Sequence, residues 1–277
     1  MSNSMKVHFY TVRAVTNMQP GSGEASQGVV DNLVQRDPAT EYPVIFGSSV
    51  KGALRAFMEA HLKDNNDGIS AIFGSNDQQG SYRFFSAHLM ALPLRSNKRP
   101  YYLAISPGGA RHVLELFEAL GFVPDKGLKE ELESIRDMNG NRPRVKGDRN
   151  GLFIEDFEQF EELGLDLPNL SKLLHSEDIV VLPDEAFNKV VSNESLPVIA
   201  RNYLDNGISK NLWYEQVIPR FSVFVMPVMY PANDGHFQEF HKTLTGNLLQ
   251  IGGNATVGYG YARVNNVPSA SQSGNAA

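Results

Sequence analysis

Residues 44–60 read VIFGSSVKGALRAFMEA, a short β-branched start followed by a strongly amphipathic continuation. Between residues 49 and 62 the apolar side chains recur at helical spacing, at Val50, Ala53, Leu54, Phe57, Met58 and Leu62. The spacing predicts a helix over 49–62. Ser48 or Ser49 is the expected N-cap, because a serine oxygen can accept a hydrogen bond from a free N–H group of the first turn.

The same stretch brings glycine, serine and lysine to a helix start, as phosphate-binding loops do. A nucleotide-binding P-loop needs Gly-x-x-x-x-Gly-Lys-Ser/Thr. Gly47 and Gly52 have the glycine spacing, but Ala53 and Leu54 occupy the Lys and Ser/Thr positions, which excludes that loop. Two interpretations remain: an anion-binding helix N-terminus, or a plain capped helix with solvated cations. Taken alone, these residues favour the plain helix.

Composition narrows the class of protein. The chain has 277 residues, of which 42% are hydrophobic, and a net charge of −6, so any nucleic-acid site must come from a local cluster of basic residues. It has no cysteine, which excludes disulfides, thiolate catalysis and cysteine-based zinc sites. Without a signal peptide or a long apolar run, we expect a soluble cytoplasmic protein with no membrane partner.

The remaining pattern alternates strands and helices. Alternation or helical spacing predicts strands at 6–15, 84–94, 100–107, 220–230 and 256–264, helices at 110–122 and 237–251, and a β-hairpin at 197–219 around Asp205-Asn206-Gly207. A long loop follows the first strand, and Gly252 or Gly253 is expected to close the last helix. This β…α…β…β…α…β order predicts an α+β, ferredoxin-like (RRM-like) sheet with helices on one face.

Domain organisation follows from the same reading. We expect a single domain over 1–264, with an insertion or flexible flap at about 123–150 that is polar and rich in turns. Residues 265–277 hold no core-forming pattern, so we expect this tail to be disordered.

Four motifs, in order, carry a family resemblance. They are GSG-x-x-x-x-GVVDN-x-x-QRD (21–37), VI-x-GSS-V-KGALR (44–55), LWYEQ-V-IP (212–219) and IGG-x-x-TVGYGYAR (251–263). In combination they resemble the RAMP superfamily of CRISPR effector proteins, and most closely the backbone nuclease subunits of type III-B (Cmr) complexes. The resemblance runs over residues 6–264.

The resemblance implies an RNA-guided function. Further copies of the chain would stack along one CRISPR guide RNA together with other subunits of the complex. A β-hairpin thumb at about 193–217 would interrupt the guide–target duplex every six nucleotides. Each copy would cut the paired target RNA once, using an aspartate and a divalent ion, Mg²⁺ or Mn²⁺.

The chain departs from the family pattern at three places. Gln19 stands where a histidine usually precedes GSG, Phe46 replaces a proline before GSS, and Ser86-Ala87 replaces a frequent Asp-Ala pair. The missing histidine weakens the expectation of nuclease activity most.

Asp31, in GVVDN, is the expected cleavage residue and metal ligand. A carboxylate beside the scissile phosphate can hold a divalent ion that stabilises charge and activates the adjacent 2′-OH. By residue type alone Asp31 would be a turn-capping aspartate; the motif favours catalysis. Glu215, in LWYEQ, is a possible second catalytic acid or equally a strand-edge carboxylate.

Two surfaces are expected to bind RNA backbone. The first comprises Arg36, Ser48, Ser49, Lys51, Gly52 and Arg55. The second comprises Thr256, Gly258, Tyr259 and Arg263, unless its glycines merely pack a strand tightly. Phosphate contacts give affinity without sequence reading, which a protein that carries arbitrary guides requires. The basic run 142–149 is expected to be solvated.

Three functions therefore stay open: an RNA-guided endoribonuclease, a non-catalytic RNA-binding scaffold of the same fold, and a guide-processing endoribonuclease. The third usually relies on a His/Tyr/Lys site, which the sequence does not show near its glycine-rich loop. Asp31 separates the first two.

Overall fold

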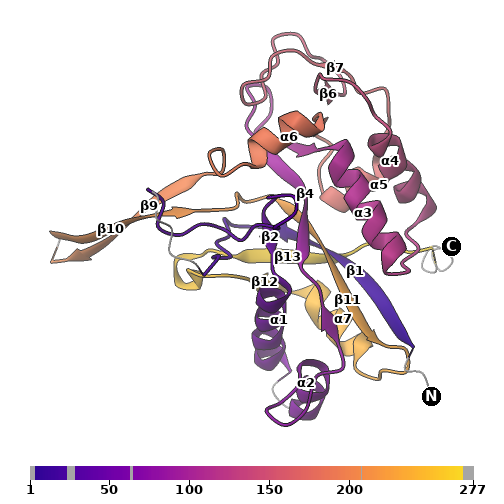
Figure 1. The fold of residues 1–277 in the computed structure, drawn as a ribbon, viewed down its shortest axis with the longest axis vertical. Coiled ribbons are helices and arrows are strands. Elements are labelled where there is room, and N and C mark those ends of the chain that lie inside the picture. The colour runs from indigo at the N-terminus through magenta and orange to yellow at the C-terminus, as the bar shows by residue number, and fades with distance from the viewer. Residues whose placement is uncertain (1–3, 24–28, 63–64, 207, 271–277) are drawn as a thin grey trace.

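The computed structural model describes residues 4–23, 29–62, 65–206 and 208–270 (Figure 1). Its strands are β1 (Met5–Ala14), β2 (Val44–Ile45), β3 (Arg83–Phe84), β4 (Ala87–Leu94), β5 (Tyr102–Ile105), β6 (Arg144–Val145), β7 (Glu161–Glu162), β8 (Ile179–Val181), β9 (Val198–Asp205), β10 (Ile208–Gln216), β11 (Val223–Pro231), β12 (Leu248–Gln250) and β13 (Tyr261–Asn266). Its helices are α1 (Gly47–His61), α2 (Asn66–Phe73), α3 (Pro107–Ala119), α4 (Lys126–Arg136), α5 (Pro168–Leu174), α6 (Asp184–Val191), α7 (Phe237–Gly246) and the 3₁₀ turn η1 (Ala255–Val257).

The core has the expected α+β order. Along the chain β1, α1, β4, β11, α7 and β13 form a βαββαβ unit, and in the sheet the neighbours run β13-β1-β11-β4, all antiparallel. β1 lies between two strands from the other end of the chain, with Thr11 opposite Val225 on one side and Asn265 on the other. The ferredoxin-like expectation is confirmed at the level of this α+β sheet.

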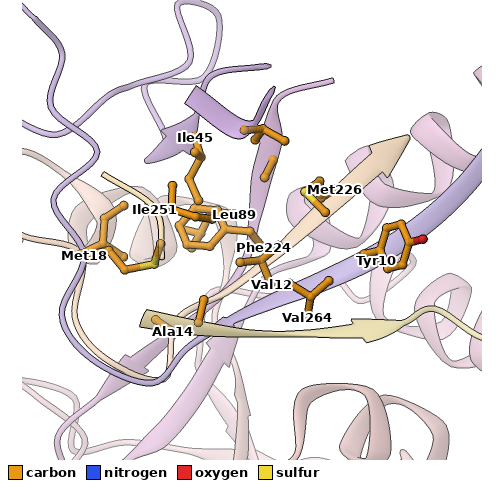
Figure 2. Packing of buried hydrophobic residues seen from close by; sticks show 14 of the residues in the cluster. Tyr10, Val12, Ala14, Met18, Ile45, Leu89, Phe224, Met226, Ile251 and Val264 are labelled. Carbon is orange, nitrogen blue, oxygen red and sulfur yellow. The ribbon is translucent and has the colours of Figure 1, made fainter. Parts of the chain in front are cut away.

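Alternation along the strands feeds two separate cores. Tyr10 and Val12 of β1 and Phe224 of β11 belong to the core on the side of α1 and α7, and Figure 2 shows Val12 and Phe224 close together. Phe9, one residue from Tyr10, points to the opposite face, because successive strand residues alternate. Each such fully buried side chain contributes roughly 1.5–3 kcal/mol through the hydrophobic effect. Both faces of the sheet are therefore buried.

The expectation of helices on one face is wrong for the chain as a whole. The second core joins Phe9 and Val225 of the sheet to apolar residues of three helices inserted between β4 and β11: α3 (Val113, Phe117), α4 (Leu128, Leu132, Ile135) and α5 (Leu170, Leu174). α3 begins at Pro107, three residues before the predicted 110, because Ser106 caps it by accepting from the Gly109 N–H.

Residues 123–150, expected to be an insertion or a flexible flap, contain helix α4 and strand β6, which favours the insertion over the flap. Asp125 caps α4 by accepting the N–H groups of Gly127 and Leu128. The basic run after α4 is paired with an acidic segment: Arg144 with Glu161 at 3.2 Å, Lys146 with Asp166, and Arg149 with Glu162. Exposed pairs of this kind contribute about 0–1 kcal/mol each, so α4's apolar face carries the stability.

Helix α1 begins at Gly47, not at a serine cap. Its N-cap is Phe46, and the Gly47 N–H donates to Ser86 Oγ at 3.1 Å, so neither Ser48 nor Ser49 has the predicted role. A Cβ on Gly47 would lie 2.7 Å from the Phe84 carbonyl oxygen. The close passage of the β3–β4 segment thus requires this glycine and supplies the missing cap.

The C-terminal elements end and start differently from the prediction. Helix α7 stops at Gly246, and Leu248, expected on its apolar face, is 44% exposed in β12, which pairs with β13. The predicted strand 256–264 begins at Tyr261, after η1. The tail was expected to be disordered from 265, yet Val267 is fully buried and the Pro268 carbonyl accepts the Asp125 N–H. Residues 271–277 lie outside the described residues.

The predicted hairpin is formed by β9 and β10, which make a two-stranded sheet of their own and project from the body (Figure 1). We call this pair the thumb hairpin. Its surface is apolar in part: Tyr203, Ile208 and Leu212 are 53–63% exposed. Asn206 adopts a left-handed φ of 51° at the tip, as a tight turn requires, and Gly207 lies outside the described residues. Among the helices described, none is long and apolar enough to cross a membrane.

Candidate nucleic-acid interface

Asp31 lies at the foot of the thumb hairpin. Its exposed carboxylate accepts the backbone N–H of Tyr214 through Oδ2 at 2.7 Å, and the Tyr214 carbonyl accepts the N–H groups of Asp31 and Asn32. The Gln216 N–H in turn donates to the Asn32 carbonyl at 2.9 Å. The loop that carries Asp31 therefore adds to β10 like a short extra strand, which fixes the carboxylate at the surface.

Two buried glutamines hold this loop in place. Gln35 donates from Nε2 to the Gly21 carbonyl and to Ser49 Oγ, and its Oε1 accepts the Phe46 N–H at 2.7 Å. This single amide ties the loop to the start of α1. Sequence reasoning missed the role, although Gln35 belongs to the QRD motif.

Gln216 makes the corresponding link on the thumb side. Its Oε1 accepts the Val34 N–H at 3.2 Å and its Nε2 donates to the Asn193 carbonyl at 2.9 Å. Because Gln216 is fully buried and its bond to Val34 lies out of solvent, leaving that bond unmade would be costly. The loop, α1 and the thumb hairpin are thus one connected unit.

Glu215 is buried and surrounded by donors. Its Oε1 accepts Trp213 Nε1–H at 2.8 Å, and its Oε2 accepts Asn254 Nδ2–H at 2.8 Å and pairs with Arg201 at 3.4 Å. The Arg201 guanidinium lies over the rings of Trp213 and Tyr259. Glu215 therefore anchors the thumb hairpin to the glycine-rich loop, while the exposed carboxylate at this foot is that of Asp31.

The α1 surface keeps part of the predicted anion site. Lys51 is exposed and forms no ion pair within the described part of the chain, and a Cβ on Gly52 would meet no atom within 4 Å. Arg55 is less available, because it pairs with Glu59 at 2.8 Å and donates to the Gly74 carbonyl. Ser48 is exposed, and Ser49 is occupied by Gln35.

Arg36 has a different setting from the other predicted RNA contacts. Its Nη1 donates to the carbonyls of Glu41 at 2.6 Å and Val191 at 2.7 Å. Burial lowers the pKa of Arg36, with the nearby carboxylates of Glu41 and Glu194 acting in the opposite direction. Its guanidinium thus joins the loop to the end of α6.

The glycine-rich loop divides into tight and open positions. A Cβ on Gly260 would lie 2.1 Å from the Ile251 carbonyl oxygen, and one on Gly252 would lie 2.5 Å from that of Gln19. Gly258, by contrast, has no atom within 4 Å of its Cβ position, and Thr256 beside it is exposed. The open part is the one that RNA can approach; Arg263 stands further along, exposed on β13.

Gln19 is packed against that loop. It is 8% exposed, and its carbonyl accepts the Gly253 N–H at 3.0 Å. Across residues 4–23, 29–62, 65–206 and 208–270, no group of three or more His, Cys, Asp or Glu side chains is arranged to hold a metal ion. A divalent ion at Asp31 would therefore take most of its oxygen ligands from outside the chain.

Comparisons with known proteins agree with this architecture. The protein named CRISPR system Cmr endoribonuclease Cmr4 of Pyrococcus furiosus is 29% identical over 94% of this chain and 95% of its own length. The CRISPR system CMR subunit Cmr4 of Saccharolobus solfataricus is 34% identical, over 31% of this chain and 29% of its own.

Solved structures share the fold. A chain of the type III-B Cmr-beta complex bound to cognate target RNA superposes with a TM-score of 0.81 at 21% identity, covering 95% of this chain and 97% of that one. Oligomeric Cmr4 from Pyrococcus furiosus gives a TM-score of 0.72 at 24% identity, covering 95% and 100%. The model of the RAMP superfamily matches residues 11–263, and the chain therefore belongs to the RAMP superfamily.

Proposed function

We propose that this chain is the guide-RNA-binding backbone subunit of a type III-B CRISPR effector complex in the cytoplasm, and that it cleaves guide-paired target RNA at six-nucleotide intervals. The observation that carries the proposal is the exposed Asp31 carboxylate, held by the Tyr214 N–H at the foot of a projecting hairpin. A relative over nearly the full length is named an endoribonuclease, which supports RNA cleavage.

Asp31 supplies the chemistry in this proposal. One carboxylate oxygen is fixed by the Tyr214 N–H, so the other is directed to solvent and to an approaching phosphodiester. Magnesium ions in proteins commonly keep several waters and use one or two carboxylates together with substrate phosphates. A single exposed aspartate fits that donor set. A divalent ion bound there would stabilise charge on the phosphate during attack by the adjacent 2′-OH, leaving a 2′,3′-cyclic phosphate and a 5′-OH.

Lys51, the free N–H groups at the start of α1 and the open part of the glycine-rich loop bind the guide backbone in this scheme. Lys51 is exposed and unpaired within the described residues, and the Gly258 position is open. Such contacts are electrostatic and independent of sequence. Further copies of the chain would continue the groove along the guide, and other subunits of the complex would close its ends.

The thumb hairpin interrupts the duplex. Tyr203, Ile208 and Leu212 are apolar and exposed on the two strands of the projecting hairpin, so they can wedge against a base pair. A displaced nucleotide splays the backbone and lets the 2′-OH reach in-line geometry, which a regular A-form helix does not supply. Asp31 at the hairpin's foot is then close to the splayed phosphate.

A non-catalytic scaffold is the second candidate, and Gln19 favours it. An amide cannot exchange protons as the histidine usual at this place can, and Gln19 is buried against Gly253. The two candidates agree on RNA binding and differ only in the fate of the target RNA.

The decisive experiment compares Asp31→Asn with Asp77→Asn, an exposed aspartate outside the site. Each protein is assembled with guide RNA and the other subunits and given labelled target RNA with Mg²⁺ or Mn²⁺. We expect Asp31→Asn to cut about 100-fold more slowly or worse while binding guide normally, and Asp77→Asn to match wild type. EDTA should abolish cutting but leave guide binding.

Each other outcome has a definite meaning. Unchanged cutting by Asp31→Asn would show that another group performs the chemistry. A wild-type complex that never cuts with either ion would establish the scaffold instead. Equal loss of guide binding and cutting in EDTA would contradict a metal that acts only in catalysis.

A further inference from the structure

A cluster of cations lies on the α3–α5 face of the sheet, away from α1. Arg13 is on the same face of β1 as Phe9, because residues four apart in a strand share a face. Its register partner on β13 is Arg263. Arg220 follows the thumb hairpin, and His175 ends α5. We call Arg13, Arg220, Arg263 and His175, with the rings of Tyr101 and Phe221, the arginine cluster.

The arginines of this cluster form no ion pair within the part of the chain that is described. Like charges directly opposite each other on antiparallel strands are destabilising, yet Arg13 and Arg263 occupy such a pair. Among the ion pairs of the described residues, none includes Arg13, Arg220 or Arg263, and Arg13 Nε is buried without a hydrogen-bond partner. Burial, and then the charges of Arg13 and Arg263, lower the pKa of His175.

Two aromatic rings stand within the charges. Tyr101 and Phe221 are stacked, with centroids 4.6 Å apart and ring planes 13° from parallel. The guanidinium carbons of Arg13 and Arg220 lie 5.0 Å and 4.8 Å from the Phe221 centroid. Arg13 also donates to the Tyr101 hydroxyl at 3.2 Å. Neither ring is fully buried, so part of their aromatic surface stays open to solvent beside the cations.

The backbone at this place is strained. Phe221 has a φ of +77°, a left-handed value that bulky side chains rarely adopt, whereas the φ of +52° at His175 is the left-handed conformation in which helices often end. Glycine would adopt such a conformation at less cost. Strain of this kind concentrates at functional sites, so an aromatic side chain kept at residue 221 indicates a use for its ring.

The cluster borders the candidate RNA interface. The Arg220 N–H donates to Asn17 Oδ1, and the Asn17 carbonyl accepts the Gly260 N–H of the glycine-rich loop. The Phe221 N–H donates to the Ala14 carbonyl, at the end of β1. An RNA strand that leaves the glycine-rich loop can therefore continue across this face of the protein.

We propose that the arginine cluster is a second RNA-binding surface, which holds the backbone of single-stranded RNA in its guanidinium groups and stacks an unpaired base on the Tyr101–Phe221 rings. Planar guanidinium forks match phosphates, and aromatic rings bind bases of any sequence. An acidic protein segment could also pair with the arginines, but it would not stack on the two aromatic rings. The inference rests on the proposed function, because it assumes an RNA-binding chain.

The test measures binding of a fluorescein-labelled 20-nucleotide oligouridylate to the purified full chain by fluorescence anisotropy over a salt series. Arg220→Gln/Arg263→Gln removes two exposed cations. Each lost phosphate contact lowers the slope of log K against log salt by about 0.7, so we expect a slope lower by about 1.4 and binding about 25-fold weaker at 0.1 M salt. The matched control is Lys6→Gln/Lys242→Gln, two exposed lysines elsewhere.

A second variant separates binding from folding. Phe221→Gly removes the ring and at the same time relieves the left-handed strain, which offsets part of the packing lost with the Tyr101 stack, so the variant should stay folded with a melting temperature close to that of wild type. We expect its RNA binding to be about fivefold weaker or worse, from the loss of base stacking. Unchanged binding by this stable variant would contradict the stacking role.

A third arm distinguishes this inference from the proposed function. Lys51→Gln/Arg55→Gln tests the α1 surface with the same probe. If only the α1 variant binds RNA more weakly than the control, the arginine cluster does not bind RNA and the proposed function stands. If neither variant does, both proposals are wrong. If the cluster variant binds RNA normally but loses self-association in sedimentation, the cluster contacts another copy of the chain.

Discussion

Replacing Glu215 by alanine tests whether this carboxylate anchors the thumb hairpin or takes part in cleavage. The substitution leaves Trp213 Nε1–H, the Asn254 amide and the Arg201 guanidinium without their acceptor. Removing one partner of a buried ion pair costs about 3–5 kcal/mol. Arg201 is 22% exposed, so water offsets part of this loss. We expect the free energy of unfolding to fall by about 3 kcal/mol, and the melting temperature by about 6 °C.

Urea unfolding measures the loss of stability, and single-turnover cleavage by the assembled complex measures the activity. Glu185→Ala is the control, because Glu185 forms an exposed pair with Lys189 at 3.2 Å and its loss should cost at most about 0.5 kcal/mol. Glu215→Gln should fall between alanine and wild type in stability, since it keeps one acceptor oxygen. The anchoring role is refuted if Glu215→Ala unfolds like wild type while cleavage falls about 100-fold.

Three further predictions concern pH, the glycine-rich loop and the hairpin. Burial lowers the pKa of His8 to about 4, below its unfolded value, so the neutral imidazole stabilises the fold fully above about pH 6.5 and less as the pH falls towards 4. Between pH 7 and pH 4.5, the free energy of unfolding measured in urea should therefore fall by about 2.5 kcal/mol less for His8→Gln than for wild type. Gly260→Ala would place a Cβ 2.1 Å from the Ile251 carbonyl oxygen, so the free energy of unfolding in urea should fall by about 3 kcal/mol or more. Gly258→Ala meets no neighbouring atom and is opposed by its φ of +84° alone, so the loss should be about 1–2 kcal/mol. Replacing residues 199–211 by a short Gly-Ser linker should leave a folded protein that binds guide RNA weakly and lacks the six-nucleotide ladder of target cuts; an unchanged ladder would assign the spacing to subunit packing.

Elements whose apolar residues follow one clear spacing could be predicted from the sequence, and elements whose pattern is dominated by polar residues could not. β1, α1 and the thumb hairpin follow from alternation, from apolar residues three and four apart, and from a turn. Helix α4 was missed, although Leu128, Leu132 and Ile135 are correctly spaced, because lysine and glutamate dominate residues 126–136. Asp125, which caps this helix, was the residue from which its start could have been predicted.

Errors at element ends have a tertiary cause. The apolar period of α7 continues through Leu248, but pairing with Arg263 on β13 converts residues 248–250 into a strand. The cap of α1 comes from Ser86, which no local reading of residues 46–49 can supply. In both cases a partner distant in sequence decides the outcome.

The candidate site shows the same division. The motif resemblance pointed to Asp31, and its surface position at the thumb hairpin is compatible with that role. The setting of Glu215 depends on Arg201, Trp213 and Asn254, contributed by both strands of the hairpin and by a loop 39 residues away. Residue type alone therefore left its two roles open, and only the contacts favour anchoring.

The position of β1 has a consequence for synthesis on the ribosome. This strand emerges first, but both of its neighbours in the sheet come late: β11 begins at Val223 and β13 at Tyr261. At roughly 5–20 residues per second, the nascent chain waits on the order of ten to forty seconds before β11 appears. During that time Phe9, Tyr10 and Val12, all fully buried in the finished fold, have no sheet partners. Newly made chains are therefore expected to depend on chaperones that shield the N-terminal strand until translation is nearly complete.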